Sequence, residues 1–291
     1  GGGIWPAAED RYLTFVVDDA PQWKKVFVGS GSPGYWSVAL RDDGTIWTWG
    51  SNSSANLGIS NLIFRRRPLQ MGLDADWAEL AAPKTGGSFA AIKADGRLFT
   101  WGENTSGQLG NGNAPVASRI PILVNAETNW RKVASGGSHM IALKNDGSLW
   151  AWGLNSSGQL GDGTTVTKNI PAQIGTATDW VRVSAGSASS YALKSDGSLW
   201  AWGSNSGGRL GDGTTTARTA PVRIGLQTEW VTVDGGTDHA FAIKQDGSLW
   251  GWGANTNGQI GNGTTNNVLQ PAQFMPGTSW QAFCAGRQNS M

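Results

Sequence analysis

The stretch DGSLWAWG at Asp146–Gly153 returns letter for letter at Asp196–Gly203. Variants of the same eight residues begin at Asp43, Asp95 and Asp246, so neighbouring copies are 52, 51, 50 and 50 residues apart. A near-constant period of this length is typical of repeat proteins, in which each copy folds as one unit against its neighbours. The sequence therefore predicts a series of similar structural units.

Two further landmarks recur with the same spacing. A tryptophan begins each of six repeats, of which five are complete, at Trp23, Trp77, Trp130, Trp180, Trp230 and Trp280. A proline lies nine residues before five of these tryptophans, at Pro68, Pro121, Pro171, Pro221 and Pro271. Because three landmarks agree, we place the repeat starts at the tryptophans and assign residues 1–291 to a single domain.

One repeat reads as four strands. We expect strands at Trp130–Gly137, His139–Lys144, Leu149–Gly153 and Ile170–Ile174, with an Asp-Gly hairpin between the second and the third. Proline cannot donate a hydrogen bond to a neighbouring strand, so the strand that contains Pro171 should lie at an edge. Four antiparallel strands with proline on the outermost one predict a blade of a β-propeller.

The paired tryptophans indicate how the blades are held together. In a strand, residues two apart share a face, so Trp150 and Trp152 point one way while Leu149 and Ala151 point the other. Both faces are apolar, as expected for a strand covered by a blade on each side. Burying one indole stabilises by roughly 4–6 kcal/mol as an upper bound. We therefore predict that the indoles fill the space between blades.

The number of blades follows from the chain ends. Six tryptophans begin repeats, but the last repeat stops after WQAFCAGRQNSM, while residues 2–5 (GGIW) align with the third strand of a repeat. We predict an all-β protein, a single β-propeller of four-stranded antiparallel blades, six in number. Residues 1–22 would complete the sixth blade, begun by residues 280–291. Seven blades, or a polymer in which one molecule completes the next, remain alternatives.

Composition restricts the classes of partner. Lys and Arg number 22 against 21 Asp and Glu, which predicts neither a nucleic-acid partner nor membrane insertion. The one basic run, Arg65–Arg67, is expected in a solvated loop, and a single cysteine excludes an intramolecular disulfide. A surface rich in Ser, Thr, Asn and Gly, with few thiols, favours a secreted or cell-surface bacterial protein, hence an extracellular location.

The stretch GGSHMIALKNDGSLWAWGLNSSGQLGDGTT, residues 136–165, resembles the repeat of the regulator-of-chromosome-condensation family. The resemblance covers nearly the whole chain and implies a β-propeller, usually of seven blades. The family includes a nuclear exchange factor for a small GTPase, a plant ultraviolet photoreceptor and a secreted β-lactamase inhibitor, so it implies no single activity. The photoreceptor motif GWRHT is absent, and no long insertion suggests an exchange-factor wedge.

The residues give no catalytic constellation. His139 and His239 occupy the same place in two repeats, where the family resemblance implies that a histidine braces turns. Neither is accompanied by the further ligands that zinc needs. Cys284 is expected to be a small buried hydrophobe, and the GDGTT loops lack the spaced carboxylates of a calcium site. We therefore expect no enzyme activity, no cofactor and no metal.

A binding surface can still be proposed from loop positions. The Gly-Gly turns and the long Gly-Gln-Leu-Gly loops should lie at one end of the blades, and the Asp-Gly hairpins at the other. The Gly-Gly turns differ most between repeats, and such differences are what a partner could recognise. The alternative is that several of these side chains pack inward. The predicted contact residues are Tyr35, Trp36, Phe89, His139, Tyr191, Asp238, His239, Arg287 and Asn289.

These observations predict a non-catalytic protein-interaction propeller whose partner is a protein of unknown identity. Self-association through the incomplete sixth blade is left open. One alternative is a structural subunit of a surface assembly or filament. The other is a regulator of a small GTPase that resembles a guanine-nucleotide exchange factor.

Overall fold

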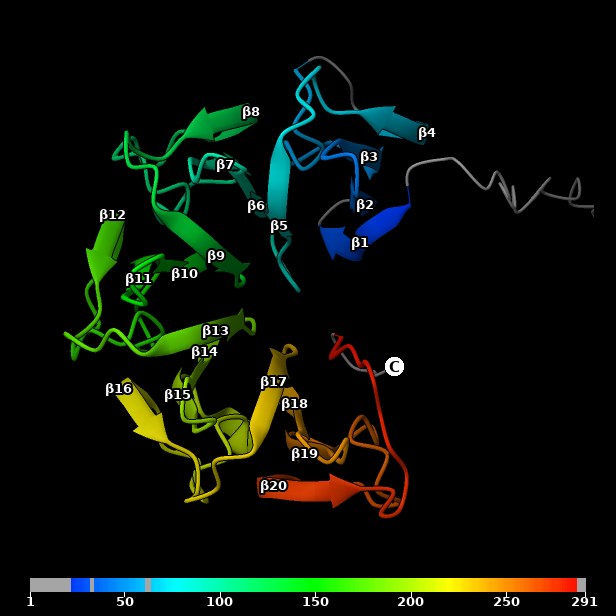
Figure 1. The fold of residues 1–291 in the computed structure, drawn as a ribbon, viewed down its shortest axis with the longest axis vertical. Coiled ribbons are helices and arrows are strands. Elements are labelled where there is room, and N and C mark those ends of the chain that lie inside the picture. Colours follow the sequence, from blue (N-terminus) through cyan, green and yellow to red (C-terminus); the bar gives the residue numbers. More distant parts are fainter. Residues whose placement is uncertain (1–21, 32–33, 61–63, 287–291) are drawn as a thin grey trace, which may run out of the picture.

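Five four-stranded antiparallel sheets make up the part of the chain that the structure describes. The structure is a computed structural model and describes residues 22–31, 34–60 and 64–286 (Figure 1). In each sheet the strands are paired in chain order. The sheets, here called blades 1 to 5, consist of β1 (Trp23–Gly31), β2 (Gly34–Arg41), β3 (Ile46–Ser51) and β4 (Phe64–Gln70); β5 (Trp77–Ala81), β6 (Ser88–Lys93), β7 (Leu98–Gly102) and β8 (Ser118–Leu123); β9 (Trp130–Ser135), β10 (His139–Lys144), β11 (Leu149–Gly153) and β12 (Lys168–Gln173); β13 (Trp180–Ala185), β14 (Ser189–Lys194), β15 (Leu199–Gly203) and β16 (Arg218–Arg223); and β17 (Trp230–Gly235), β18 (His239–Lys244), β19 (Leu249–Gly253) and β20 (Val268–Phe274).

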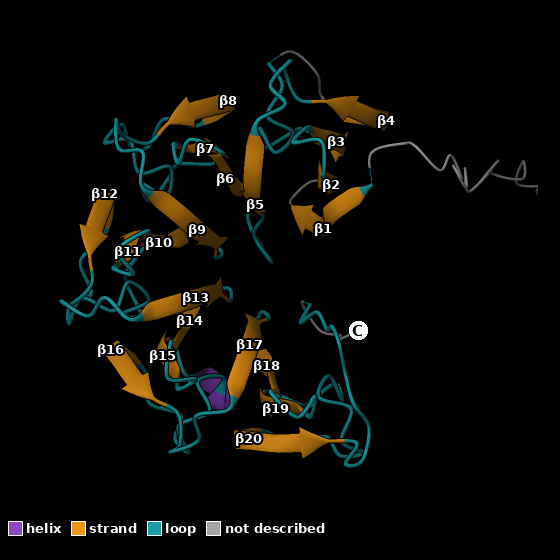
Figure 2. Ribbon diagram, viewed as in Figure 1, coloured by secondary structure: helices purple, strands orange, loops and turns teal. Residues whose placement is uncertain are grey.

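The blades are arranged around a common centre, with the first strand of each innermost and the fourth outermost (Figure 1). The ring is open on one side, between blade 1 and the segment that follows β20 (Figure 1). Strands and loops account for almost all of the described chain, with one short 3₁₀ turn, η1 (Ser206–Gly208) (Figure 2). The predicted all-β propeller with proline on each outermost strand is confirmed.

The prediction of six blades, and its alternative of seven, is wrong, because the described residues form five. Residues 280–286 contain one isolated bridge residue and no strand. Their contacts with blade 5 are of the kind that a repeat start makes with the blade before it: Trp280 N donates to Gly247 O at 2.8 Å, as Trp230 N donates to Gly197 O at 3.2 Å. Ala285 N also donates to Asp234 Oδ2 at 3.0 Å. In the described residues this segment therefore packs on blade 5 without forming a sheet of its own.

The tail also covers apolar surface. Trp280, Phe283 and Ala285 pack with Phe241 and Phe274 of blade 5. Residues 1–22 were expected to complete the sixth blade, and residues 1–21 lie outside the described residues. Self-association or polymer formation through a sixth blade therefore has no structural basis in the described part of the chain.

Each Asp-Gly hairpin is a hydrogen-bonded unit that continues into the tryptophan. In blade 3, Asp146 Oδ1 accepts hydrogen bonds from Ser148 N (2.9 Å) and Ser148 Oγ (2.7 Å), and these bonds lower the pKa of Asp146. Ser148 Oγ in turn accepts from Trp150 Nε1 at 2.9 Å. Gly147 between them has φ of +80°, which explains the invariant glycine at this turn. The motif D-G-S-x-W is therefore one local structure.

The second tryptophan of each pair connects two blades. Trp152 is fully buried, and its Nε1 donates to Gln108 O in the long loop of blade 2 at 3.0 Å. The same bond joins Trp202 to Gln159 O and Trp252 to Arg209 O. Trp150, which is partly buried, packs on the same cluster. The prediction that the indoles fill the space between blades is therefore confirmed.

The final glycine of each Gly-Gln-Leu-Gly loop makes room for that indole. A Cβ added to Gly161 would lie 2.6 Å from Trp202 Nε1, closer than real Cβ atoms come to a neighbour, and φ at Gly161 is +81°. Any side chain there would push against a buried ring. The close packing of the next blade's tryptophan on this loop therefore requires a residue without a side chain at this position.

A cation–aromatic cluster, which we did not predict, closes the hairpin end of each blade. Lys144 Nζ lies 3.5 Å from the ring centroid of Trp150 and 4.9 Å from that of Trp130, while Glu127 Oε1 is 2.7 Å away. The buried lysine side chain is thus stacked on two indoles and paired with a carboxylate, both of which offset the cost of burying a cation. The equivalent cations in the other blades are Arg41, Lys93, Lys194 and Lys244.

Burial of the landmark tryptophans depends on a preceding blade. Trp77, Trp130, Trp180 and Trp230 are 2–4% exposed, whereas Trp23, beside the opening of the ring, is 45% exposed. The same residue type at the same repeat position thus differs only because of what lies beside it. Indole burial is a property of the assembled ring and not of the isolated repeat.

Candidate functional site

The two ends of the ring carry the loops that the sequence assigned to them. The Gly-Gly turn of blade 3 lies beside the start of its long loop, because Leu154 N donates to Ser138 O at 2.8 Å. The Asp-Gly hairpins close the opposite end, where Leu143 pairs with Leu149. We call these ends the turn face and the hairpin face.

Five of the predicted contact residues are buried. They are at most 3% exposed, and they lie near the start of the second strand of each blade, where a neighbouring blade covers the side chain: Trp36, Phe89, His139, Tyr191 and His239. A buried side chain has no free area to offer to a partner. The alternative that several of these residues pack inward therefore describes the structure.

The remaining members of the predicted contact set differ in accessibility. Tyr35 is 80% exposed on the turn face. Asp238 is partly exposed and forms an ion pair with Arg209, with Asp238 Oδ1 2.6 Å from Arg209 Nη2. Arg287 and Asn289 lie outside the described residues. Among the described members of the predicted contact set, Tyr35 and Asp238 are therefore the two that a partner could reach.

The two histidines are structural elements. His139 Nε2 lies 3.0 Å from Ser190 Oγ, which itself donates to Gln159 O at 2.8 Å, so the ring joins blade 3 to blade 4. Burial lowers the pKa of His139 to about 4, and burial likewise lowers the pKa of His239 to about 4. Both imidazoles are therefore neutral at pH 7. Within the described residues, no three His, Cys, Asp or Glu side chains come close enough together to hold a metal ion.

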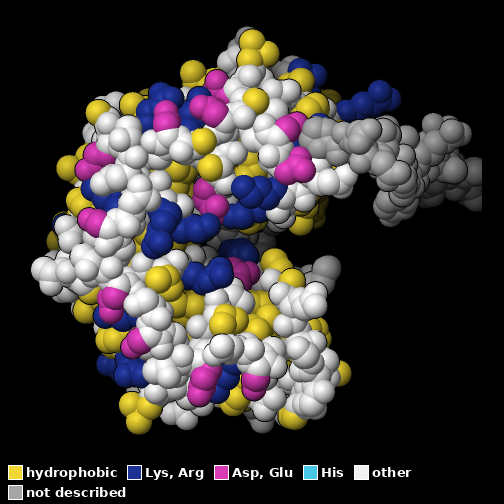
Figure 3. Space-filling view, viewed as in Figure 1, with side chains coloured by type: hydrophobic (Ala, Val, Ile, Leu, Met, Phe, Trp, Pro, Cys, Tyr) yellow, Lys and Arg dark blue, Asp and Glu magenta, His cyan; other side chains and the backbone are white. Residues whose placement is uncertain are grey.

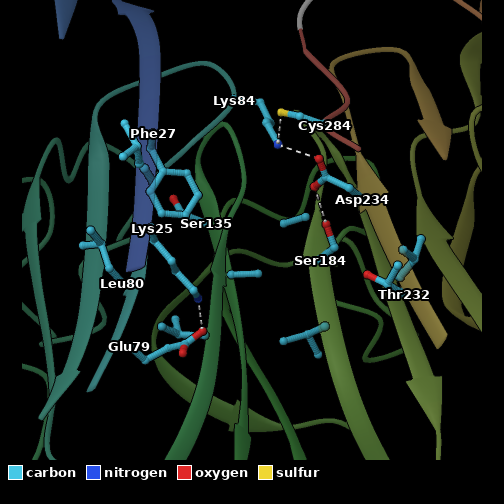
Figure 4. Close-up of a pocket in the computed structure, with 18 of the residues that line it drawn as sticks. Lys25, Phe27, Glu79, Leu80, Lys84, Ser135, Ser184, Thr232, Asp234 and Cys284 are labelled. Carbon is cyan, nitrogen blue, oxygen red and sulfur yellow. Dashed lines mark hydrogen bonds and ion pairs between the residues drawn. The ribbon is translucent and has the colours of Figure 1, made fainter. Parts of the chain in front are cut away.

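A cavity of about 700 Å³ runs along the centre of the ring, lined by the first strand of every blade and by residues 281–284 (Figure 4). Near the turn face, Lys84 reaches across it, with Nζ 2.8 Å from Asp234 Oδ2 and 3.9 Å from Cys284 Sγ. Asp234 Oδ1 also accepts from Ser184 Oγ at 3.1 Å. Asp234 thus connects blades 2, 4 and 5 to the C-terminal segment.

The charge of Lys84 is stabilised by this arrangement. Burial by itself lowers the pKa of Lys84, but the Asp234 carboxylate and the Cys284 thiol outweigh it, so the pKa lies above its ordinary value. Cys284 was expected to be buried, and this is wrong: it is exposed. The reason is that residues 280–286 form no inner strand that a further blade could cover.

Lys24, Lys25 and Glu79 line the hairpin end of the cavity, and further cations follow the landmark tryptophans of blades 3 and 4. We define the channel mouth as Lys24, Lys25, Glu79, Arg131, Lys132 and Arg182, the residues one or two positions after four of the landmark tryptophans. Glu79 is shared by Lys25 and by Lys132, whose Nζ is 3.3 Å from Oε2. Figure 3 shows Lys and Arg side chains gathered around the centre of the ring, with a few Asp and Glu among them.

The remaining cations of the channel mouth have no carboxylate partner in the described chain. Lys24 Nζ donates to Ala78 O at 3.2 Å, and Arg131 Nη2 donates to Trp180 O at 3.0 Å. Arg182 is exposed, and its side chain makes no ion pair or hydrogen bond with the described residues. Charge is therefore concentrated here although the whole chain is nearly neutral.

The sequence contained a signal for this site. The two residues after each landmark tryptophan read Lys-Lys, Ala-Glu, Arg-Lys, Val-Arg and Val-Thr in blades 1 to 5. The cations are about 50 residues apart in the chain, so no basic run is visible. Only the comparison of equivalent positions around the ring brings them together. The predicted loop at Arg65–Arg67, by contrast, is part of strand β4.

The fold and the motifs together define a propeller built from repeats of the chromosome-condensation-regulator type. A model of the RCC1-like domain matches residues 15–291, and the chain belongs to this family. It is 34% identical over 139 residues to the human protein named probable E3 ubiquitin-protein ligase HERC6, covering 46% of this chain and 14% of that protein. It is 30% identical over 165 residues to the mitochondrial RCC1 domain-containing protein RUG3 of Arabidopsis thaliana, covering 55% of this chain and 34% of that protein.

Solved structures show the same fold. Human WBSCR16 superposes with a TM-score of 0.78 at 22% identity, over 88% of this chain and 68% of that one. Yeast RCC1 (Prp20), solved bound to Kap60, gives a TM-score of 0.75 at 21% identity, over 88% and 63%. The chain spans less than half the length of the curated relatives it matches.

The relatives do not support every expectation drawn from composition. They come from human, mouse and Arabidopsis thaliana, and nothing among them favours a bacterial-type member or secretion. In the described part of the chain, no helix is long and apolar enough to cross a membrane. The extracellular location stays a prediction.

Proposed function

We propose that this RCC1-like domain is a non-catalytic protein-interaction module. The observation that supports the proposal is that repeated residues pack the blades together, whereas exposed residues at two places differ from one repeat to the next. The repeated tryptophans, turn aspartates and stacked lysines are used in packing the blades. Exposed residues that differ between repeats lie at the channel mouth and at the rim of the turn face.

This division suits recognition. A symmetric array can distinguish a non-repeating partner only where its copies differ. At the channel mouth the copies differ in charge, and on the turn face Tyr35 is exposed without an equivalent in the other repeats. The shifted pKa values support a scaffold, because they belong to inter-blade histidines, hairpin aspartates and the Lys84–Asp234 pair.

The named structural neighbours support a protein partner and suggest a second candidate function. Prp20p of Saccharomyces cerevisiae is described by its binding properties to Gsp1p and histones. Regulation of a small GTPase by nucleotide exchange is therefore kept as the second candidate function. A structural subunit of a surface assembly is the third, and no feature of the five-bladed ring favours it.

The test is capture of partners on the immobilised domain, with surface variants as probes. Loss of the same captured protein on Tyr35→Ala, Asp238→Ala or substitution at the channel mouth, with an unchanged melting temperature, supports the module. Unchanged capture by all of these variants contradicts it. Release of labelled GDP from purified small GTPases is measured in parallel, and acceleration beyond about tenfold would establish the second candidate instead.

A further inference from the structure

We propose that the channel mouth binds an acidic, extended peptide segment of a partner protein. This proposal rests on the proposed function, since it names the class of partner for one of its two surfaces. The channel mouth brings five cationic side chains and one carboxylate, Glu79, to the inner end of four neighbouring blades. The excess positive charge is the feature that needs a partner.

The unpaired donors have the geometry for carboxylates. Arg131 uses one N–H on Trp180 O, which leaves its other guanidinium donors for a ligand, and Arg182 uses none on the described residues. A guanidinium binds a carboxylate through two parallel hydrogen bonds, and an ion pair at an exposed site gains from several neighbouring charges. Lys132 is half satisfied by Glu79 and lies on β9 beside Arg131.

Blades 3 and 4 supply the least satisfied part of the site. Arg131 already extends from β9 to the first residue of β13, and Arg182 is the third residue of β13. Two guanidinium groups on adjacent inner strands can therefore hold successive acidic side chains of one extended segment. Blade 5 contributes only Val231 and Thr232 at these positions, so the positive charge is not distributed evenly around the ring.

A peptide fits this site better than nucleic acid does. Binding of DNA requires a track of cations along many phosphates. Here the cations are confined to the centre, and the exposed hairpin aspartates Asp146, Asp196 and Asp246 lie on the same face. These carboxylates would repel a polyphosphate backbone laid across the hairpin face. A single extended chain that ends or turns at the centre avoids them.

The repeats supply substitutions that the scaffold tolerates. Valine stands at the position of Arg131 in blades 4 and 5, and threonine stands at the position of Arg182 in blade 5. The double variant Arg131→Val/Arg182→Thr therefore removes two charges with residues already used there. Arg66→Ala/Arg67→Ala removes two exposed charges from the outer strand β4 and is the matched control.

The experiment measures binding of a fluorescein-labelled decaglutamate peptide by anisotropy, with decaglutamine, single-stranded DNA and duplex DNA of ten nucleotides as comparisons. We expect decaglutamate to bind and decaglutamine not to bind. The channel-mouth variant should weaken decaglutamate binding about tenfold, since each exposed ion pair contributes a factor of about two to five. The control should change it less than about twofold.

Four results would overturn the proposal: no binding of decaglutamate, equal weakening in both double variants, equal binding of decaglutamine, or tighter binding of either DNA with loss on the channel-mouth variant. A melting temperature more than a few degrees below wild type would redirect the test to Arg182→Thr alone, judged by the same criteria. If decaglutamate fails while captured partners still depend on Tyr35 or Asp238, the acidic-peptide site is refuted and the interaction module is not.

Discussion

Substitution of Gly161 by alanine should separate the inter-blade contact from the backbone requirement of its loop. Gly161 has φ of +81° and lies under the indole of Trp202, while Gly163, two residues on, has the same φ of +81° and no atom within 4 Å of an added Cβ. Both alanines therefore meet the same unfavourable backbone conformation. Only Gly161→Ala also pushes against the next blade.

The expected magnitudes differ accordingly. A left-handed conformation costs an L-residue about 1–2 kcal/mol, which is all that Gly163→Ala should lose. In Gly161→Ala the Cβ would stand 2.6 Å from Trp202 Nε1, so the ring must shift, at about 1–3 kcal/mol for overpacking. The hydrogen bond from Trp202 to Gln159 O would be weakened, for about 1 kcal/mol more. Gly161→Ala should therefore cost about 3–6 kcal/mol in total.

The measurement is urea unfolding of both variants and wild type, followed by tryptophan emission. Gly161→Ala should lower the unfolding midpoint clearly more than Gly163→Ala does. Equal losses in the two variants would refute the argument that this glycine exists to admit the indole.

Three further changes test other contacts. His139→Ser places at this position the residue found as Ser88 and Ser189, and it should reduce the dependence of stability on acid. Burial lowers the pKa of His139 to about 4, so the wild type loses about 3 kcal/mol of stability from this residue as the pH falls from 6.5 to 4. An unchanged slope in urea unfolding measured against pH would contradict this. Asn155→Ala should lower stability by about 3 kcal/mol in thermal unfolding, because the buried Oδ1 of Asn155 accepts from Leu160 N and its Nδ2 donates to Val166 O. The control is Asn169→Ala, at an exposed position, which should cost under about 0.5 kcal/mol. Asp234→Asn should lower the free energy of unfolding by about 1–3 kcal/mol at pH 7. The pKa of Lys84 is raised above its ordinary value of 10.5, so the ion pair is lost only as the pH rises through that raised pKa, and the cost of the substitution should then decrease. A loss that does not depend on pH would contradict this prediction.

Much of the blade could be predicted because its determinants are local. The Asp-Gly turn, the alternation around Trp150 and Trp152 and the proline of the outermost strand each act within a few residues, and all are confirmed. The candidate site was less predictable. Trp36, Phe89 and Tyr191 were proposed as contacts because they vary, but variation within a strand between two blades can equally be a change of packing.

The channel mouth was missed for the opposite reason. Its cations look isolated along the chain and become neighbours only when the first strands converge on one centre. A charge run is a property of sequence distance, whereas an electrostatic site is a property of distance in space. The ion pairs of Glu79 with Lys25 and Lys132, across three blades, show how the ring converts a period of about 50 residues into contact.

By itself, then, the sequence determined the period, the four-stranded antiparallel unit, its turns and the indoles between units, because these depend on short-range geometry repeated in every copy. The tertiary structure alone decided the number of blades and the face on which charge gathers. Residues 280–286 keep the contacts of a repeat start with the blade before it, since Trp280, Phe283 and Ala285 pack on blade 5 and Trp280 N donates to Gly247 O, yet they form no strand. Whether a segment joins a sheet depends on a pairing partner elsewhere in the chain, and a pattern repeated within each copy does not contain that information.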